Sequence, residues 1–313
     1  RLGISDTVTF TATFSESMLD SPTITIGDGV VNKTMTVSNS SSSVVSSVWL
    51  YTLDMSTWSG TDSDTFKVTV AGKDLADNPY SGSDSITISI DTATPTLTLT
   101  DTDADNIIGS SGSVTITATF SEAMAVSPTI TIGNGVINQG MSATSSSAVW
   151  IYYLSASSYQ GSGTTASVTV AGTDLNGNAY SGSESITFTF DYTNPQVTQN
   201  GISADNLTVS LTFNESVFTD LISGQGSNSL STSDFEISLS GNSSVTLGSS
   251  SPTSVTRISG TNIYSLTISL TGFASGQETL TITIPNNSIY DIAGNSLSTV
   301  INISLKNNLL VYY

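Results

Sequence analysis

The 313-residue chain carries 25 acidic and 6 basic residues, for a formal net charge of -19, and it has neither cysteine nor histidine. This acidic excess argues against nucleic-acid binding, which needs clustered Lys and Arg to neutralise phosphates. Without Cys there is no disulfide framework, and without His the commonest general base is missing. Hydrophobic residues make up 37% of the chain, enough for small packed cores. No apolar run approaches about 18 residues, so no membrane insertion is expected.

The sequence contains one pattern twice and a looser version of it a third time. Residues 13–35, "TFSESMLDSPTITIGDGVVNKTM", recur as 119–141, and residues 68–87, "VTVAGKDLADNPYSGSDSIT", recur as 168–187. The third copy keeps "LTFNES" at 211–216 and "YDIAGNSLS" at 290–298. A period of about 100 residues matches one small domain.

Apolar and polar residues alternate in nearly every segment, which is the period of a half-buried strand. "VTFTATF" at 8–14, "VTITATF" at 114–120 and "LTVSLTF" at 207–213 are corresponding examples. About seven short strands per repeat, separated by Gly, Ser, Asn and Asp turns, predict an all-β chain of three tandem Ig-like β-sandwich domains in an extended array.

Two proline-containing segments, "DTATP" at 91–95 and "DYTNP" at 191–195, join the repeats. Proline fixes φ and favours an extended residue before it, so these joints are expected to be stiff. The predicted domains are residues 1–91, 92–192 and 193–313, called here the first, second and third repeats.

Alignment of the first two repeats places Arg1 opposite Ile107. The first repeat therefore lacks a counterpart of the first strand, 94–105, while an apolar tail, 306–313, follows the last expected strand. Two explanations stay open. The chain is a piece of a longer array, or a strand from a neighbouring subunit covers the open edge, as in donor-strand assembly.

Acidic residues fall where Ig topology brings separate segments to one pole of each sandwich. The loop after the second strand, the loop before the last strand and the incoming linker meet there. The sequence predicts one such group at Asp91, Glu122, Asp174 and Asn178, a second at Asp191, Glu215, Asp291 and Asn295, and a third at Glu16 and Asp74. Asp101, Asp103 and Asp105 are expected to face the joint with the third repeat and to join the second group.

Crowded carboxylates repel one another more strongly as water is excluded, and Ca²⁺, which accepts six to eight oxygens in loose geometry, would relieve that repulsion. We therefore predict Ca²⁺ at the joints. The alternative is that these Asp and Asn residues only form turns, as they do in most sandwiches. No nucleophile–base arrangement, phosphate loop or other cofactor site stands out, so the chain is predicted not to be an enzyme.

The segments "TFSEAM", "SPTITIG", "VWIYYL" and "VAGTDLNGNAYSGSESITFTFD" resemble the bacterial Ig-like repeats of giant extracellular adhesins and other cell-surface proteins. The likeness covers about residues 1–192, and the third repeat resembles a related module more loosely. It implies export to the bacterial cell surface, tandem arrays and frequent Ca²⁺ rigidification, and it names no ligand.

The sequence thus favours a structural segment of an extracellular adhesin, stalk or filament, whose partners are neighbouring repeats of the same polypeptide or filament. The alternatives are a module that binds glycans or other cell surfaces directly, a filament subunit that exchanges strands, and an accessory domain of a secreted enzyme.

Overall fold

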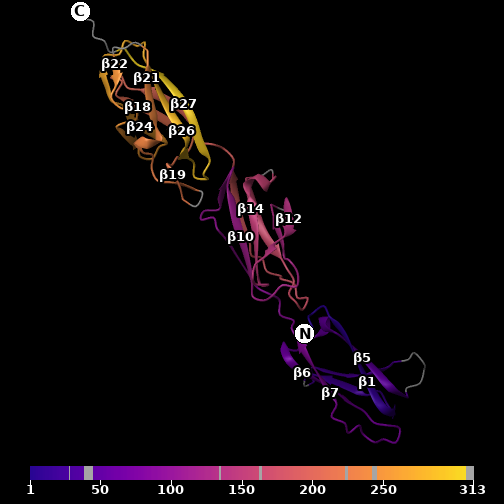
Figure 1. Cartoon of the computed structure of the whole chain (residues 1–313). Coiled ribbons are helices and arrows are strands. Elements are labelled where there is room, and N and C mark those ends of the chain that lie inside the picture. Colours follow the sequence, from indigo (N-terminus) through magenta and orange to yellow (C-terminus); the bar gives the residue numbers. More distant parts are fainter. Residues whose placement is uncertain are drawn as a thin grey trace, which may run out of the picture.

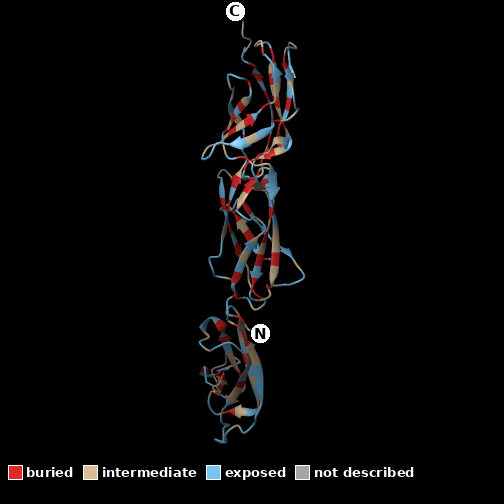
Figure 2. Cartoon of the chain, turned by 90° about the vertical axis from the view of Figure 1, so that its left-hand side faces the viewer, coloured by how far each residue is buried: buried red, intermediate tan, exposed pale blue. Residues whose placement is uncertain are grey.

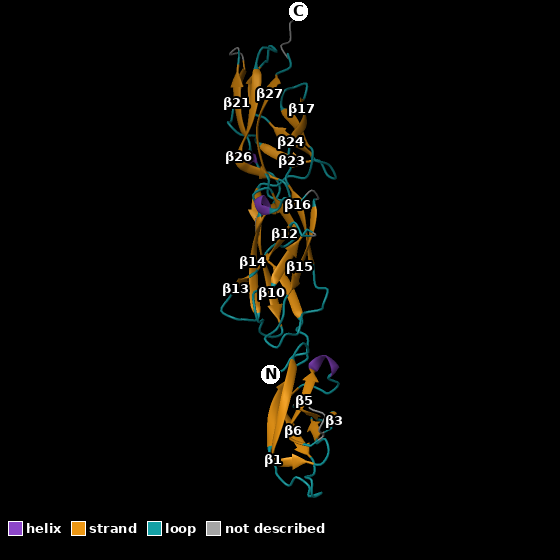
Figure 3. Ribbon diagram, turned by 90° about the vertical axis from the view of Figure 1, so that its right-hand side faces the viewer, coloured by secondary structure: helices purple, strands orange, loops and turns teal. Residues whose placement is uncertain are grey.

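Three β-sandwiches follow one another along a rod in the computed structural model (Figures 1 and 3). The N-terminus lies beside the junction of the first and second repeats (Figure 1). The structure describes residues 1–27, 29–38, 45–133, 135–161, 164–222, 225–241 and 245–307. Within these ranges, no helix has the length and apolar character needed to cross a membrane.

The first repeat has one sheet with the strand order β1-β5-β4 and one with the order β3-β2-β6-β7. Residue Leu2 adds a parallel bridge to Ile90 at the end of the second sheet. The elements are β1 (Thr7–Met18), β2 (Thr23–Ile26), β3 (Val31–Thr34), β4 (Thr36–Val37), β5 (Ser46–Asp54), the 3-10 turn η1 (Met55–Thr57), β6 (Ser63–Ala71) and β7 (Ser85–Ile90).

The second repeat has the sheet orders β13-β14-β10-β8 and β12-β11-β15-β16-β9, with β9 parallel to β16 and all other pairs antiparallel. This is the arrangement of an Ig-like sandwich. The elements are β8 (Leu97–Asp101), β9 (Ile107–Gly109), β10 (Ser113–Phe120), β11 (Thr129–Ile132), β12 (Ile137–Gly140), β13 (Ser142–Ala143), β14 (Val149–Ser155), η2 (Ala156–Ser158), β15 (Thr165–Ala171) and β16 (Ile186–Asp191).

The third repeat pairs β17-β18-β24-β23 in one sheet and β21-β26-β27 in the other, with two small two-stranded sheets, β19-β20 and β22-β25. The elements are β17 (Val197–Ile202), β18 (Thr208–Phe213), β19 (Asp220–Ile222), β20 (Gln225–Ser227), η3 (Thr232–Asp234), β21 (Glu236–Ser240), β22 (Val245–Leu247), β23 (Ser254–Arg257), β24 (Ile263–Thr267), β25 (Leu270–Gly272), β26 (Thr279–Tyr290) and β27 (Ser296–Ser304).

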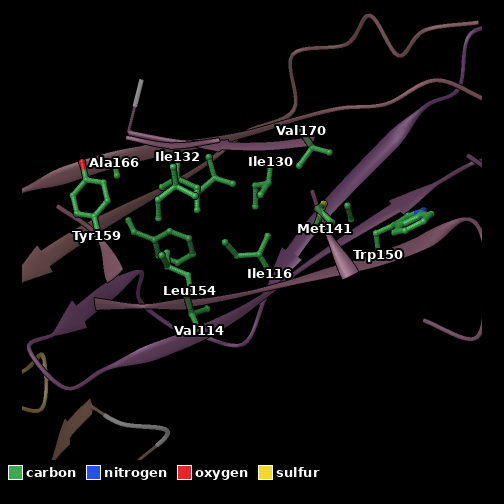
Figure 4. Close-up of a cluster of buried hydrophobic side chains, with 14 of the residues drawn as sticks. Val114, Ile116, Ile130, Ile132, Met141, Trp150, Leu154, Tyr159, Ala166 and Val170 are labelled. Atoms are coloured by element: carbon green, nitrogen blue, oxygen red, sulfur yellow. The ribbon is translucent and has the colours of Figure 1, made fainter. Parts of the chain in front are cut away.

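Each repeat encloses its own hydrophobic cluster, and buried residues alternate with exposed ones along the strands (Figure 2). The period-2 pattern produces this arrangement because successive side chains of a strand point to opposite faces. In the second repeat Ile116, Ile130, Ile132 and Leu154 are fully buried between the sheets (Figure 4). The predicted boundaries near residues 91 and 192 fall between the clusters.

The all-β architecture expected from the sequence is confirmed. Of the apolar tail, the structure describes Lys306 and Asn307, and Lys306 exchanges two backbone hydrogen bonds with the Asn206 side chain. The rest of the tail, 308–313, lies outside the described residues, so the role considered for this tail in strand exchange stays a prediction.

Candidate metal centres at the joints

Each repeat presents the same small loop before its last strand, in the pattern Asp-x-x-x-Asn. The loops are 74–78, 174–178 and 291–295. In each, the backbone N–H of the Asn donates to one carboxylate oxygen of the Asp, and the Asn side-chain amide donates to the other. Position four of the loop has positive φ, at Asp77, Gly177 and Gly294. The Asp-x-x-x-Asn pattern therefore forms a loop in which the Asn donates two hydrogen bonds to the carboxylate of the Asp in the same loop.

In the second and third repeats this Asn also ties the loop to the preceding repeat. Asn178 Nδ2 donates to the carbonyl oxygen of Asp91 at 2.9 Å, and its Oδ1 accepts from the backbone N–H of Ile4 at 3.1 Å. Asn295 repeats both contacts, to the carbonyl oxygen of Asp191 at 3.0 Å and from Ser110 N–H at 2.7 Å. One buried amide thus connects three segments from two repeats at each joint.

A glycine lets the preceding repeat approach this loop closely. A Cβ on Gly3 would lie 1.5 Å from the carbonyl oxygen of Asn176, and a Cβ on Gly109 would lie 2.2 Å from that of Ala293. No side chain fits at either distance, since the obstacle is backbone. Gly3 and Gly109 occupy the same position in the aligned repeats, so the two joints are built alike.

Beside each Asn, three carboxylates from three segments converge. Oxygens of Asp91, Glu122 and Asp174 lie within 4.8 Å of one another, and so do oxygens of Asp191, Glu215 and Asp291. The first residue of each group comes from the end of one repeat, and the other two come from loops of the next. These are the only such groups of three or more among the residues described.

The carboxylates are held away from water without full compensation by cations. Asp174 and Asp291 are fully buried, Asp91 is 5% exposed, and the other three are half-buried. Burial, followed by the charges of Asp174 and Asp91, raises the pKa of Glu122. Burial, followed by Asp291 and Asp191, raises the pKa of Glu215.

Burial is also the main cause that raises the pKa of Asp291, against the lowering effect of its hydrogen bonds from Asn295. A raised carboxyl pKa means that the charged form is disfavoured in the folded protein. Both joints therefore concentrate negative charge that a bound cation would neutralise.

The donor set suits Ca²⁺. Two oxygens bound to one Ca²⁺ lie at most about 5 Å apart, because each Ca–O distance is about 2.3–2.6 Å. Both groups satisfy that limit. The first joint differs at Asp91 Oδ2, which lies 2.9 Å from Arg1 Nη1 and accepts from Asn176 Nδ2 at 2.8 Å, so both groups compete there with a cation.

The third predicted group is not assembled. Glu16 is exposed on β1, Asp74 is half-buried and Asn78 is exposed. Within the described part of the chain, no preceding segment supplies the carboxylate that Asp91 and Asp191 supply at the joints. Here the hydrogen bonds from Asn78 lower the pKa of Asp74.

Asp101, Asp103 and Asp105 were expected at the second joint, but the structure does not bring them into either carboxylate group. Asp101 ends β8 opposite Ile116, and its carboxylate accepts from the backbone N–H of Asp103. Asp105 accepts from the N–H of Ile107. The segment makes turns, and Gly109 and Ser110, a few residues later, contact the third repeat instead.

Sequence reasoning missed Gly3, Gly109 and the backbone donors Ile4 and Ser110. The sequence did contain a sign of their shared role, because "LGIS" at 2–5 aligns with "IGSS" at 108–111 when the first two repeats are compared. It also treated Asn178 and Asn295 as cation ligands, whereas their Oδ1 atoms accept from the preceding repeat and their amide groups hold the carboxylates.

Comparison with known proteins gives no family assignment. No model of a protein family matches the chain, and no curated protein matches it. One similar solved structure is from a 1.5-MDa bacterial ice-binding adhesin studied for host cell surface retention. It is 17% identical, with 97% of this chain and 93% of that chain covered at a TM-score of 0.45.

A second is a Ca²⁺-stabilized adhesin of an Antarctic bacterium that binds ice, also 17% identical, with 97% of this chain and 70% of that chain covered at a TM-score of 0.45. The D1–D4 ectodomain fragment of ICAM-5 follows at 12% identity and a TM-score of 0.34, with 98% and 73% covered. Scores this low carry no argument about function.

The fold and the joints define a class by themselves: a chain of Ig-like sandwiches linked through short acidic joints. The chain is similar to bacterial adhesin repeats in its sequence patterns, and what it does is argued from the joints.

Proposed function

We propose that the chain is a non-catalytic structural segment of an extracellular bacterial adhesin, stalk or filament, in which Ca²⁺ at the joints holds neighbouring repeats in line. The observation that carries the proposal is the pairing of carboxylates across both joints. Each group takes one residue from the repeat before the joint and two from the repeat after it, so a cation held there links two sandwiches.

The proposed ligands are Asp91, Glu122 and Asp174 at the first joint and Asp191, Glu215 and Asp291 at the second. Asn178 and Asn295 fix the carboxylates and the linkers in place. A bound Ca²⁺ supplies positive charge to oxygens that otherwise repel one another. Without it, the linkers are held by a few hydrogen bonds, and the repeats are expected to swing about the joints.

An extended, stiff segment serves to project something else away from a surface. The acidic surface, the absence of Cys and the resemblance to adhesin repeats support an exported, cell-surface location. The adhesin neighbours, one of them Ca²⁺-stabilized, are in keeping with this role.

Small-angle scattering tests the proposal. In millimolar Ca²⁺ the chain is expected to give the narrow cross-section and long maximum dimension of three sandwiches in line. In chelator the distance distribution is expected to broaden toward shorter values. A distribution unchanged by Ca²⁺, together with no Ca²⁺ uptake, would overturn the proposal.

A further inference from the structure

The edge of the first repeat differs from the corresponding edge of the other two. Strand β1 pairs with β5 on one side, and within the described residues no strand pairs with its other side. In the second repeat β8 covers that side of β10, and in the third β17 covers β18. The corresponding sheet therefore occurs in all three repeats, and it carries this edge strand in the second and third repeats but not in the described part of the first.

A groove of about 680 Å³ lies along the open edge of β1. Phe10, Ala12 and Phe14 of β1 line it from one sheet, and Ile24, Val70 and Ile86 line it from the other. The groove thus runs between the edges of the two sheets, where it exposes side chains that belong to the sandwich interior.

Comparison with the second repeat shows what is missing. Val114, Ala118 and Phe120 on β10 are 1%, 0% and 3% exposed. Their counterparts Val8, Ala12 and Phe14 are all only half-buried.

The opposite wall shows the same difference. Ile86 is 55% exposed, whereas its counterpart Ile186 packs against the second core. In that core Leu97 and Leu99 of β8 fill the equivalent space, Leu97 being 6% exposed and Leu99 partly buried.

We propose that this groove accepts an extended strand that has the sequence pattern of β8 and is not already part of another sandwich, running antiparallel to β1. The register follows from the second repeat, where Leu97 lies opposite Phe120 and Leu99 opposite Ala118. The incoming strand therefore places two leucines opposite Phe14 and Ala12, with threonines outward.

A second copy of this chain is a poorer occupant. Its own β8 and β17 are already paired in their sandwiches, so donating either would open another core. An added strand also satisfies the backbone groups along the edge of β1. The groove is separate from both carboxylate groups, so this proposal does not depend on Ca²⁺.

The test adds the strand to the full chain. Residues 94–106 are placed directly before Arg1, because Arg1 aligns with Ile107, and a control carries the same addition with Leu97→Asp and Leu99→Asp in the added copy. Amide hydrogen exchange is then followed along β1 in the unextended, extended and control chains.

The extended chain is expected to slow exchange across residues 7–14 by more than about tenfold, since each leucine removed from water is worth roughly that factor in an equilibrium constant. The control is expected to match the unextended chain. No slowing in the extended chain, or equal slowing in both, would overturn the proposal. So would an unextended chain that dimerises and protects β1 in the dimer, which would make a second copy the occupant.

Discussion

The Asp74 loop of the first repeat and the Asp174 loop of the second share their internal hydrogen bonds but differ in surroundings. Asp74 accepts from Asn78 at the same atoms and nearly the same distances as Asp174 from Asn178. Asn78 is exposed, whereas Asn178 is fully buried against the first repeat. The loop is thus formed by its own sequence, and the joint is added by a neighbour that docks on it.

The loops of the first and third repeats also differ in how their surroundings change the pKa of the Asp. The pKa of Asp74 is lowered by hydrogen bonds from Asn78, while that of Asp291 is raised, mainly by burial, despite equivalent bonds from Asn295. The charged form of this Asp is therefore favoured in the exposed loop of the first repeat and disfavoured at the second joint. A cation would remove that difference, and four predictions test this view.

The largest effect is expected from Ca²⁺ itself. An ion that binds the folded state alone stabilises it by about 2.7 kcal/mol at a hundredfold excess over Kd. We expect amide exchange in the joint loops of the second and third repeats to slow in Ca²⁺ relative to chelator, while exchange in the 74–78 loop stays unchanged. Equal protection of all three loops would show a general salt effect and would contradict the role of the joints.

The second-largest effect is a difference in stability between variants of the buried Asn178 and of the exposed Asn78. Asn178→Ala removes the donor to the buried carbonyl oxygen of Asp91, one of the donors to the Asp174 carboxylate and the acceptor of the Ile4 N–H. A buried polar group left unsatisfied costs about 1–3 kcal/mol. Asn78→Ala, the matched control, is expected to cost less than about 1 kcal/mol because water replaces the lost bonds. The free energy of unfolding of both variants is measured by urea titration, with hydrogen exchange used to follow each repeat separately. Equal losses would mean that Asn178 acts only within its own loop.

The first joint is expected to bind Ca²⁺ more tightly once its cation is removed. Arg1→Gln takes away a charge beside Asp91, worth about 1 kcal/mol at 4 Å in water-like surroundings, or about fivefold in affinity. Lys73→Gln, whose ammonium pairs with Asp77 on the exposed loop, is the control and is expected to leave affinity unchanged. Calorimetric titration of both variants with Ca²⁺ measures the change in Kd. An unchanged Kd for Arg1→Gln would mean that the ion does not bind beside Asp91.

The smallest effect concerns pH in the absence of metal. The raised pKa values of Glu122, Glu215 and Asp291 favour the folded state while these groups are protonated. Their contribution is fully present below the ordinary carboxyl pKa and is lost as pH rises through the raised values.

The lowered pKa of Asp74 acts in the opposite sense, because its contribution is present above the ordinary pKa and is lost as pH falls through the lowered value. In chelator, acidification should therefore raise the protection factors, which correct exchange rates for the intrinsic effect of pH on exchange, at the joints but not in the 74–78 loop. Glu122→Gln and Glu215→Gln should weaken the response at their own joints, and an unaltered response would assign it to other groups.

The sequence predicted the sandwiches well because alternation along segments such as 114–120 depends only on which face of a strand meets the core. It also brought Asp91, Glu122 and Asp174 to one pole, since Ig topology fixes where loops meet. It wrongly assigned Asp101, Asp103 and Asp105 to the second joint, because an Asp that forms a turn cannot be distinguished by sequence from an Asp that binds an ion. It missed Gly3 and Gly109 because their role is visible only when the backbone of another repeat lies within 2.2 Å of the missing Cβ.

The central claim is that each joint holds one Ca²⁺ through carboxylates from two repeats, and calorimetric counting of bound ions tests it most directly. The wild-type chain is expected to bind two Ca²⁺ at its joints, Glu122→Gln and Glu215→Gln to lose one each, the double variant to lose both, and Glu16→Gln to lose none. A stoichiometry that the joint variants leave unchanged, or that Glu16→Gln lowers, would contradict the account.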